Sequence, residues 1–258
     1  MKMHLYGLPE NPKMLLIHGV LMPWQVWEPQ IQYYKEKYHV LVVELDGHTQ
    51  DKPSRFVSAE MQAQKIEKYC EDREIESFAV VCGLSIGGVI AQILWSNQKL
   101  HFERMILDGV PLVPAGRVVS TVMSKAFQKF VHKSQTRDPK TLESLKKNFV
   151  PERSMDAFFA LVDLVSDTSI ENMVYSMCQS ELRIDVDNQT KIAYAHGTKP
   201  SETLSQKSAK LLKDLYPETD IVCFVGDSNC YKAVFEPEIW MNVMNDFLES
   251  PEETGTIE

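Results

Sequence analysis

One serine in the chain stands in a setting that could make it a nucleophile. It is Ser85, at the centre of Gly83-Leu84-Ser85-Ile86-Gly87. The preceding run 78–82 is apolar and rich in valine, which predicts a buried strand, and the following run 89–95 has helical character. Glycines two positions before and after the serine suit a strained turn, because side chains there would block the bend. Such a turn presents the hydroxyl at the positive N-terminal end of the next helix.

This segment resembles the nucleophile elbow of the α/β-hydrolase superfamily, and the resemblance implies that Ser85 is a catalytic nucleophile. It extends to His18-Gly19, because in this family a strand ending in His-Gly precedes the loop that supplies one oxyanion-hole amide. The implied donors are the backbone N–H groups of Val20 and of Ile86, directly after the serine. Preorganised amides of this kind typically lower the barrier by about 3 kcal/mol each.

Two histidines flank these segments, and we expect neither to do proton chemistry. His18 ends a predicted strand, and we expect backbone groups to satisfy its ring. His48 follows Asp46-Gly47, which matches only partly an Asp-x-x-Gly-x-Gly loop that the family often places there. We interpret His48 as a solvated loop residue.

A serine hydroxyl needs a base to take its proton, and usually an acid that orients the base. The resemblance implies an acid three residues beyond the glycine that ends the next-to-last strand, but Pro200 occupies that position. Glu202 lies two residues further and is the first candidate, although the helix dipole also favours a carboxylate in a first turn. Asp108 is the second candidate, because some members carry the acid after the strand that follows the elbow. An Asp before Gly109 also suits a simple turn.

The position of the base departs further from the family pattern. Related sequences place a histidine shortly before the closing helix and its Pro-Glu turn, here Pro237-Glu238. Counting back from Pro237 reaches Asn229 or Cys230, of which Asn229 fits better, and no histidine follows His196. An amide can hold a water molecule or the serine by hydrogen bonds, but it has no usable basicity near neutral pH.

Three explanations stay open for Asn229. It replaces a histidine deliberately, to silence turnover or to trap an acyl-enzyme. Alternatively, the natural protein has lost its base and now binds rather than cleaves. In the third and least favoured explanation, His48 or His18 serves as the base by unusual geometry.

Strands and helices alternate along most of the chain. Strands are predicted at 2–6, 13–18, 39–45, 78–82, 104–107, 191–196 and 220–225, and helices at 24–38, 58–75, 89–95, 201–216 and 236–248. This alternation predicts an α/β fold with a mainly parallel sheet flanked by helices. Helical periodicity without a convincing strand follows Pro114, and the resemblance implies that such an insertion forms a cap over the serine. We therefore expect a core of residues 1–113 and 189–258 and a helical cap of residues 114–188.

The composition limits the partners of this chain. Its 258 residues suffice for one large α/β domain or for a core with an inserted cap, and its net charge of −9 argues against nucleic acid or an anionic membrane surface. Five cysteines without close pairing, among them Cys82 and Cys223 in predicted core strands, suggest reduced thiols in a cytoplasm. We expect a small-molecule substrate or ligand, and neither metal nor other cofactor.

Two functions follow from these residues. The first is a serine hydrolase of esterase type that acts on a small or medium acyl substrate through a Ser85 acyl-enzyme and is impaired in this copy by Asn229. The second is a catalytically inactive α/β-hydrolase-fold protein that binds a small apolar ligand. Cleavage of C–C bonds, lyase and haloperoxidase chemistry use the same scaffold, so the fold alone does not decide the reaction.

Overall fold

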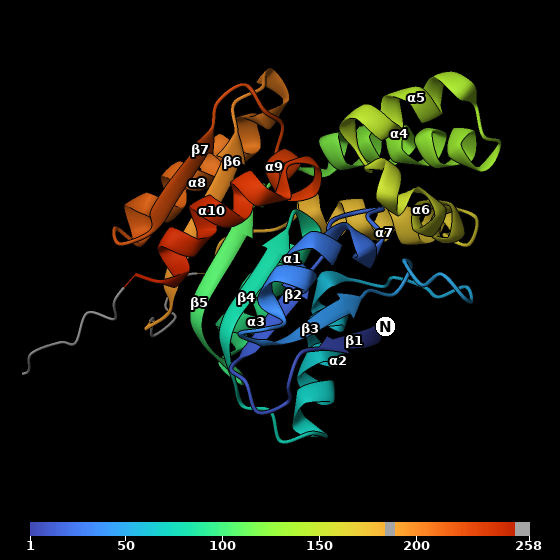
Figure 1. Cartoon of the computed structure of the whole chain (residues 1–258). Helices are drawn as coiled ribbons and strands as arrows, with labels where there is room; N and C mark the ends of the chain where they lie inside the picture. Colours follow the sequence, from blue (N-terminus) through green and yellow to red (C-terminus); the bar gives the residue numbers. More distant parts are fainter. Residues whose placement is uncertain (184–188, 251–258) are drawn as a thin grey trace, which may run out of the picture.

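The computed structural model describes residues 1–183 and 189–250, and a seven-stranded sheet runs through them (Figure 1). The strand order is β1-β3-β2-β4-β5-β6-β7, with β1 antiparallel to β3 and every other pair parallel. The strands are β1 (Lys2–Tyr6), β2 (Lys13–Ile17), β3 (His39–Glu44), β4 (Ser77–Leu84), β5 (His101–Asp108), β6 (Lys191–Gly197) and β7 (Asp220–Phe224). The predicted mainly parallel α/β sheet is confirmed.

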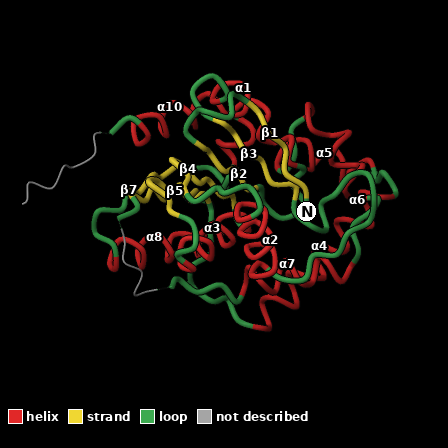
Figure 2. The backbone as a smooth tube through the Cα atoms, turned by 90° about the horizontal axis from the view of Figure 1, so that it is seen from below, coloured by secondary structure: helices red, strands yellow, loops and turns green. Residues whose placement is uncertain are grey.

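Helices cover both faces of the sheet, as the view along the sheet in Figure 2 shows. One face packs against α2 (Ala59–Glu71), α3 (Ile86–Asn97) and α8 (Thr203–Leu215). The other face packs against the 3-10 helix η1 (Trp24–Trp27), α1 (Glu28–Tyr34), α9 (Tyr231–Phe235) and α10 (Pro237–Leu248). Apolar side chains of the central strands point alternately to the two layers, so each face has its own buried core.

In the sequence, four helices follow β5 and precede β6. They pack beside the carboxyl ends of the central strands (Figure 1). They are α4 (Arg117–Gln135), α5 (Pro139–Asn148), α6 (Met155–Val162) and α7 (Asp167–Cys178), with a short 3-10 turn at Glu152–Ser154. The described residues of the segment contain no strand, as predicted. Apolar side chains of these helices form a third buried cluster together with Val20, Leu21 and Ile86, so the insertion packs directly over the loop after β2 and the start of α3.

The structure differs from the predicted elements at several points. The single helix expected over 24–38 is a 3-10 turn followed by the short α1, because Pro29 permits a helix start but no continuous helix from residue 24. The short helix α9, between β7 and α10, was not predicted. The expected end of the cap at 188 and the end of the core at 258 lie outside the described residues.

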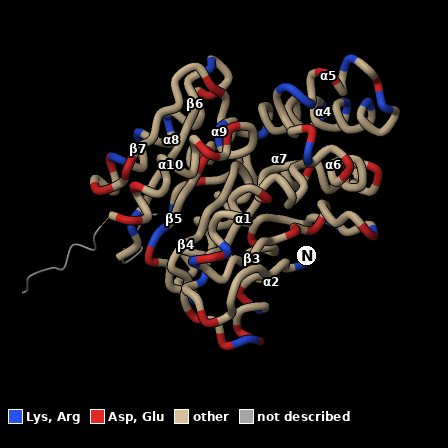
Figure 3. Tube along the Cα trace, in the orientation of Figure 1, with Lys and Arg blue, Asp and Glu red and all other residues tan. Residues whose placement is uncertain are grey.

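Charged residues lie mainly at strand ends and on the outer helices, with both signs mixed (Figure 3). Within the described ranges, none of the helices combines the length and the apolar character that a membrane span requires. All five cysteines are free thiols. Cys223 was predicted to lie in a core strand, but it is exposed, because β7 is an edge strand with much of its length open to solvent.

Candidate active site

Ser85 occupies a strained turn between β4 and α3. Its backbone has φ 50° and ψ −117°, outside the regions that ordinary residues favour, and its N–H donates to the Asp108 carbonyl at 2.9 Å. A Cβ added at Gly83 would lie 2.4 Å from the backbone nitrogen of Gly88, and one at Gly87 would lie 2.3 Å from the Ile17 carbonyl oxygen. Both flanking glycines are therefore required by backbone contacts, as the sequence pattern predicted.

The two amides expected to form an oxyanion hole have no partner in the part of the chain that the structure describes. Val20 and Ile86 are buried, and within residues 1–183 and 189–250 neither N–H donates a hydrogen bond. Gly87 touches the carbonyl oxygens of Ile17 and His18, so the start of α3 lies directly against the end of β2. An oxyanion hole requires unpaired donors of this kind, and this role of Val20 and Ile86 stays a prediction.

His18 and His48 hold the loop after β2 in place. Their rings meet edge to face with centroids 4.6 Å apart. His18 Nε2 accepts from the Leu45 N–H and Nδ1 donates to the Gly19 carbonyl, while His48 Nε2 accepts from the Leu21 N–H and Nδ1 donates to the Asp46 carbonyl. Leu21 itself has a left-handed backbone with φ 54°. Each ring is fixed in one neutral tautomer by backbone groups, as was expected for His18.

Neither histidine can serve Ser85 as a base. Both rings are fully buried, and burial lowers the pKa of His18 to about 4 and that of His48 well below its ordinary value. The interpretation of His48 as a solvated loop residue is wrong. The turn at Gly47, with φ 75°, folds the segment beneath Met173 and Phe56 and removes the ring from water.

Asn229 lies in the loop after β7, but its side chain is committed elsewhere. Its Oδ1 accepts from the Gly197 N–H at 3.0 Å, and its Nδ2 donates to the Ser205 hydroxyl. The Cβ of Asn229 lies close against Gly109, where an added Cβ would come within 2.4 Å of it. Asn229 thus joins β6 to α8, and no contact joins its side chain to Ser85 among the described residues.

Cys230, the other residue reached by counting back from Pro237, shares a hydrogen-bond acceptor with Ser85. Its sulfur lies 3.2 Å from the Asp108 carbonyl oxygen, which also accepts the N–H of Ser85. Its backbone N–H donates to the Asp108 carboxylate at 3.0 Å. Burial, reinforced by the charge of Asp108, raises the pKa of the thiol well above its ordinary range. At neutral pH Cys230 is therefore a protonated thiol and no proton acceptor.

The two carboxylates proposed as the acid occupy different environments. Asp108 is 1% exposed and accepts from the Cys230 N–H and, at 3.0 Å, from the Trp240 indole. Burial outweighs these hydrogen bonds and raises its pKa to about 6, with a smaller contribution from the charge of Glu202. Glu202 lies in a 3-10 turn (Pro200–Glu202), is partly exposed and accepts from Ser201. Hydrogen bonds connect Asp108, and not Glu202, to Ser85 and Cys230.

The Ser85 hydroxyl faces the helical insertion. Its Oγ lies 3.3 Å from the thioether sulfur of Met177 on α7. In the described structure, no histidine, lysine or carboxylate side chain is bonded to this hydroxyl. Nor do three His, Cys, Asp or Glu side chains gather as metal ligands would in the same residues. Sequence reasoning did not identify Met177, because an apolar residue on one of several helical stripes carries no signal for its partner.

Comparisons with known proteins find the same architecture. No protein-family model matches the chain. An alpha/beta hydrolase family protein from Desulfitobacterium hafniense is 22% identical with a TM-score of 0.76, covering 96% of this chain and 100% of that one. An esterase from Exiguobacterium antarcticum is 16% identical with a TM-score of 0.71, covering 96% of each chain.

Curated relatives match over shorter segments. The (E)-2-((N-methylformamido)methylene)succinate hydrolase of Acinetobacter baylyi is 38% identical over 61 residues, which is 24% of this chain and 22% of the relative. A pimeloyl-[acyl-carrier protein] methyl ester esterase of Legionella pneumophila is 27% identical over 106 residues, or 41% of each protein. The matched regions thus span less than half the length of these relatives. Together with the sheet order and the Ser85 turn, the structural neighbours show that this chain has the α/β-hydrolase fold.

Proposed function

We propose that the chain is an esterase-type α/β-hydrolase-fold protein that receives the carbonyl of a small or medium acyl substrate at Ser85. The observation that carries this proposal is the strained Ser85 turn next to two buried N–H groups without partners, on Val20 and Ile86. A carbonyl oxygen bound by both amides would bring its carbon toward the serine hydroxyl. The names of the similar proteins, esterases and hydrolases, support a hydrolytic reaction type.

We further propose that residues 114–188 act as a cap over this site. The contact between Met177 and the Ser85 hydroxyl, together with the apolar cluster that α4–α7 share with Val20 and Ile86, supports this role. An acyl group entering the site would displace the thioether from the hydroxyl and meet an apolar surface. A flexible methionine suits this position, because its side chain adapts to different occupants.

In this proposal turnover is impaired because no base among the described residues is bonded to the Ser85 hydroxyl. Attack on a carbonyl requires the Ser85 proton to leave as the new C–O bond forms, and the thiol of Cys230 cannot take it. Loss of the base in a serine hydrolase lowers kcat by on the order of a millionfold, while the oxyanion hole and substrate binding retain a residual rate enhancement. We therefore expect slow acylation of Ser85 rather than complete inertness.

The experiment is intact-mass analysis after incubation with a fluorophosphonate probe. It compares the wild type with Cys230→His, Asn229→His and Ser85→Ala. Cys230→His should gain one label at Ser85, because the position of Cys230 lies beside Ser85 and Asp108. Asn229→His should gain little, because that side chain points to Gly197 and Ser205. Stronger labelling of Asn229→His would assign the base position to residue 229, and rapid labelling of the wild type would refute the impairment.

A second candidate is a catalytically inactive binding protein for a small apolar ligand. The observation that favours it is that the Met177 thioether, rather than a base, lies beside the Ser85 hydroxyl. Apolar side chains of the helical insertion pack over the same region. It predicts thermal stabilisation by a reversible ligand that persists in Ser85→Ala. If Cys230→His and Asn229→His both remain unlabelled while such a ligand stabilises the wild type, this candidate replaces the esterase.

A further inference from the structure

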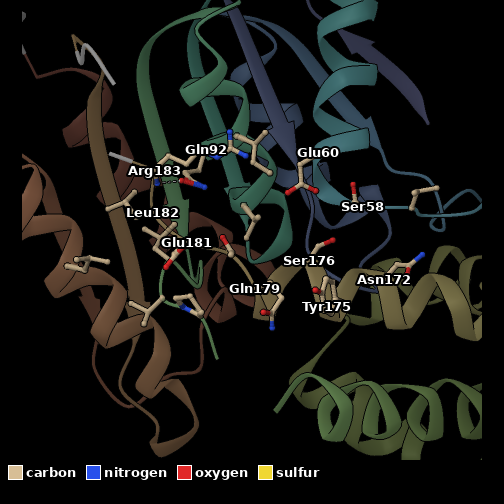
Figure 4. Close-up of a pocket in the computed structure, with 18 of the residues that line it drawn as sticks. Ser58, Glu60, Gln92, Asn172, Tyr175, Ser176, Gln179, Glu181, Leu182 and Arg183 are labelled. Carbon is tan, nitrogen blue, oxygen red and sulfur yellow. Dashed lines mark hydrogen bonds between the residues drawn. The ribbon is translucent and has the colours of Figure 1, made fainter. Parts of the chain in front are cut away.

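A cavity lies beside α3, apart from Ser85. Its volume is about 1210 Å³, and it is bounded by the start of α2, by α3, α7 and α8, and by the segments 112–114 and 179–183 (Figure 4). None of Ser85, Asp108 and Cys230 lines it. The cavity is therefore a different place from the candidate active site, and its size is comparable to that of small-molecule pockets.

Much of this cavity is apolar. Val89 and Ile93 of α3 contribute to its wall together with Leu112. Side chains that ordinarily avoid water gather at its rim, where Tyr175 is 49% exposed and Leu215 is 44% exposed. Apolar residues collected around a hollow, rather than scattered singly, indicate a binding surface.

Polar groups without partners adjoin this apolar surface. Ser180 is 7% exposed, and its buried hydroxyl has no hydrogen-bond partner among the described residues. The buried Nε2 of the neighbouring Gln179 likewise lacks an acceptor in the described structure. Ser176 and Glu60 point into the cavity in Figure 4. Buried donors without acceptors are rare in native proteins, and a ligand oxygen would satisfy them.

The charged side chains that line the cavity favour neither an anion nor a cation as its ligand. Among the described residues that line the cavity, Glu60 and Glu181 carry negative charge and Arg183 carries the one positive charge. The Arg183 backbone N–H donates to Gln92 Oε1 at 2.8 Å, and its guanidinium forms no ion pair with any described residue. An anion would meet two carboxylates, and a cation would meet unpaired donors and a guanidinium. An uncharged ligand avoids both of these unfavourable interactions.

We propose that this cavity binds an uncharged amphiphile, with an apolar chain against α3 and α8 and a carbonyl or amide oxygen near Ser180 and Gln179. The proposal is independent of the function proposed for Ser85, because no residue of that site takes part. The same helix, α7, contributes Met177 to the active site and Ser176 to this cavity.

The test is isothermal titration calorimetry with N-octylacetamide, an uncharged molecule with an octyl chain and one amide carbonyl. Wild type and Ser85→Ala should bind one equivalent with the same Kd. Leu215→Asp should weaken binding about tenfold or more, because it places a carboxylate in the apolar rim, and Ser180→Ala should weaken it about threefold. Ile239→Asp is the matched control, since Ile239 is 47% exposed on α10 and lies outside the cavity, and its Kd should stay within about twofold of wild type.

Several results would overturn the proposal. They are the absence of saturable binding to the wild type, unchanged binding by Leu215→Asp, and equal weakening by Ile239→Asp. Loss of binding in Ser85→Ala would place the probe at the active site instead. Tighter binding of octanoate or octyltrimethylammonium than of N-octylacetamide would refute the uncharged class of ligand. Urea denaturation of each variant confirms that the titrated protein is folded.

Discussion

Ser85 has a first side toward β2 and α3 and a second side toward β5 and the loop after β7. The two sides differ in whether their polar groups are already hydrogen-bonded within the protein. Toward β2 and α3, the N–H groups of Val20 and Ile86 donate to nothing in the described structure. Toward β5 and the loop after β7, the polar groups are bonded to one another. Asp108 accepts from Cys230 and Trp240, and Asn229 bridges Gly197 and Ser205.

This difference separates two requirements of hydrolysis. Stabilisation of an oxyanion needs donors that are held in place but unpaired, and the first side has them. Proton transfer needs a group with a pKa near neutrality within reach of the hydroxyl. On the second side the Cys230 thiol is protonated, and the Asp108 carboxylate, with a pKa of about 6, is bonded to Cys230 and Trp240 rather than to the Ser85 hydroxyl. In the function proposed above, the first side would therefore be free to bind a substrate oxygen, while the polar groups of the second side are part of the protein's internal packing.

The largest expected effect comes from placing an imidazole on the second side. Cys230→His should raise the rate of hydrolysis of a short-chain aryl ester by roughly 10² to 10⁴-fold, the usual contribution of a general base. Asn229→His should raise it by less than about tenfold. The measurement is steady-state release of 4-nitrophenol from its acetate, with Ser85→Ala added to each variant as the background. Equal rates for both histidine variants would contradict the separate roles of residues 229 and 230.

The next prediction tests how strongly backbone contacts constrain the Ser85 turn on the first side. Gly87→Ala should lower the free energy of unfolding by about 3 kcal/mol or more, because its Cβ would lie 2.3 Å from the Ile17 carbonyl oxygen and backbone cannot yield. Gly226→Ala, in the loop after β7, should cost only about 1 kcal/mol, since that glycine has φ 84° but nothing within 4 Å of an added Cβ. Urea denaturation measures both. Similar losses in the two variants would show that the elbow is no more constrained than an open turn.

A third prediction concerns the buried carboxylate of the second side. The pKa of Asp108 is raised to about 6 from an ordinary 3.8, so the folded state binds more protons than the unfolded state between these values. Stability therefore falls as pH rises through this window, by about 3 kcal/mol in all. The difference in unfolding free energy between wild type and Asp108→Asn should thus change between pH 4 and pH 7.

Glu202→Gln is the control for this measurement, because Glu202 is partly exposed and should leave most of the slope unchanged. If Glu202→Gln removed the slope and Asp108→Asn did not, the titrating group would be Glu202.

The smallest expected effect is a difference in reactivity between the exposed thiol and the buried thiols. Burial raises the pKa of Cys70, Cys82, Cys178 and Cys230, whereas Cys223 is exposed on β7. Titration of the native protein with Ellman's reagent should release one fast equivalent of thiolate, and Cys223→Ser should release none. A second fast thiol that disappears in Cys230→Ser would show that the second side is open and reactive.

Much of the fold was predictable because its signals are local. The strands were predicted from short apolar runs, and the glycines around Ser85 indicated a turn, because a side chain at Gly83 would collide with the nearby backbone of Gly87 and Gly88. The burial of His48 was not predictable in the same way. It depends on Met173 and Phe56, which reach Gly47 from other parts of the chain.

The base position shows a second limit of sequence reasoning. Counting back from Pro237 leads to two adjacent residues, and adjacent residues in a loop point in different directions. Cys230 has a left-handed backbone, with φ 62°, and its thiol bonds to the Asp108 carbonyl that also accepts the Ser85 N–H, while the Asn229 side chain bonds to Gly197. A count along the sequence contains no information on this dihedral angle. The choice between Glu202 and Asp108 failed to resolve for the same reason, because both follow a strand and only packing separates them.

The Ser85 turn has a consequence for how such a protein can change over evolutionary time. Its strained backbone, which typically costs about 1–3 kcal/mol, is enforced by contacts of Gly83 with the start of α3 and of Gly87 with the end of β2. A single side chain added at either glycine would collide with this backbone, whereas residue 230 lies in a separate loop after β7. In the function proposed for Ser85, the turn is therefore under stronger steric constraint than the position of the base, and a substitution in the loop after β7 could add or remove a base while the turn persists.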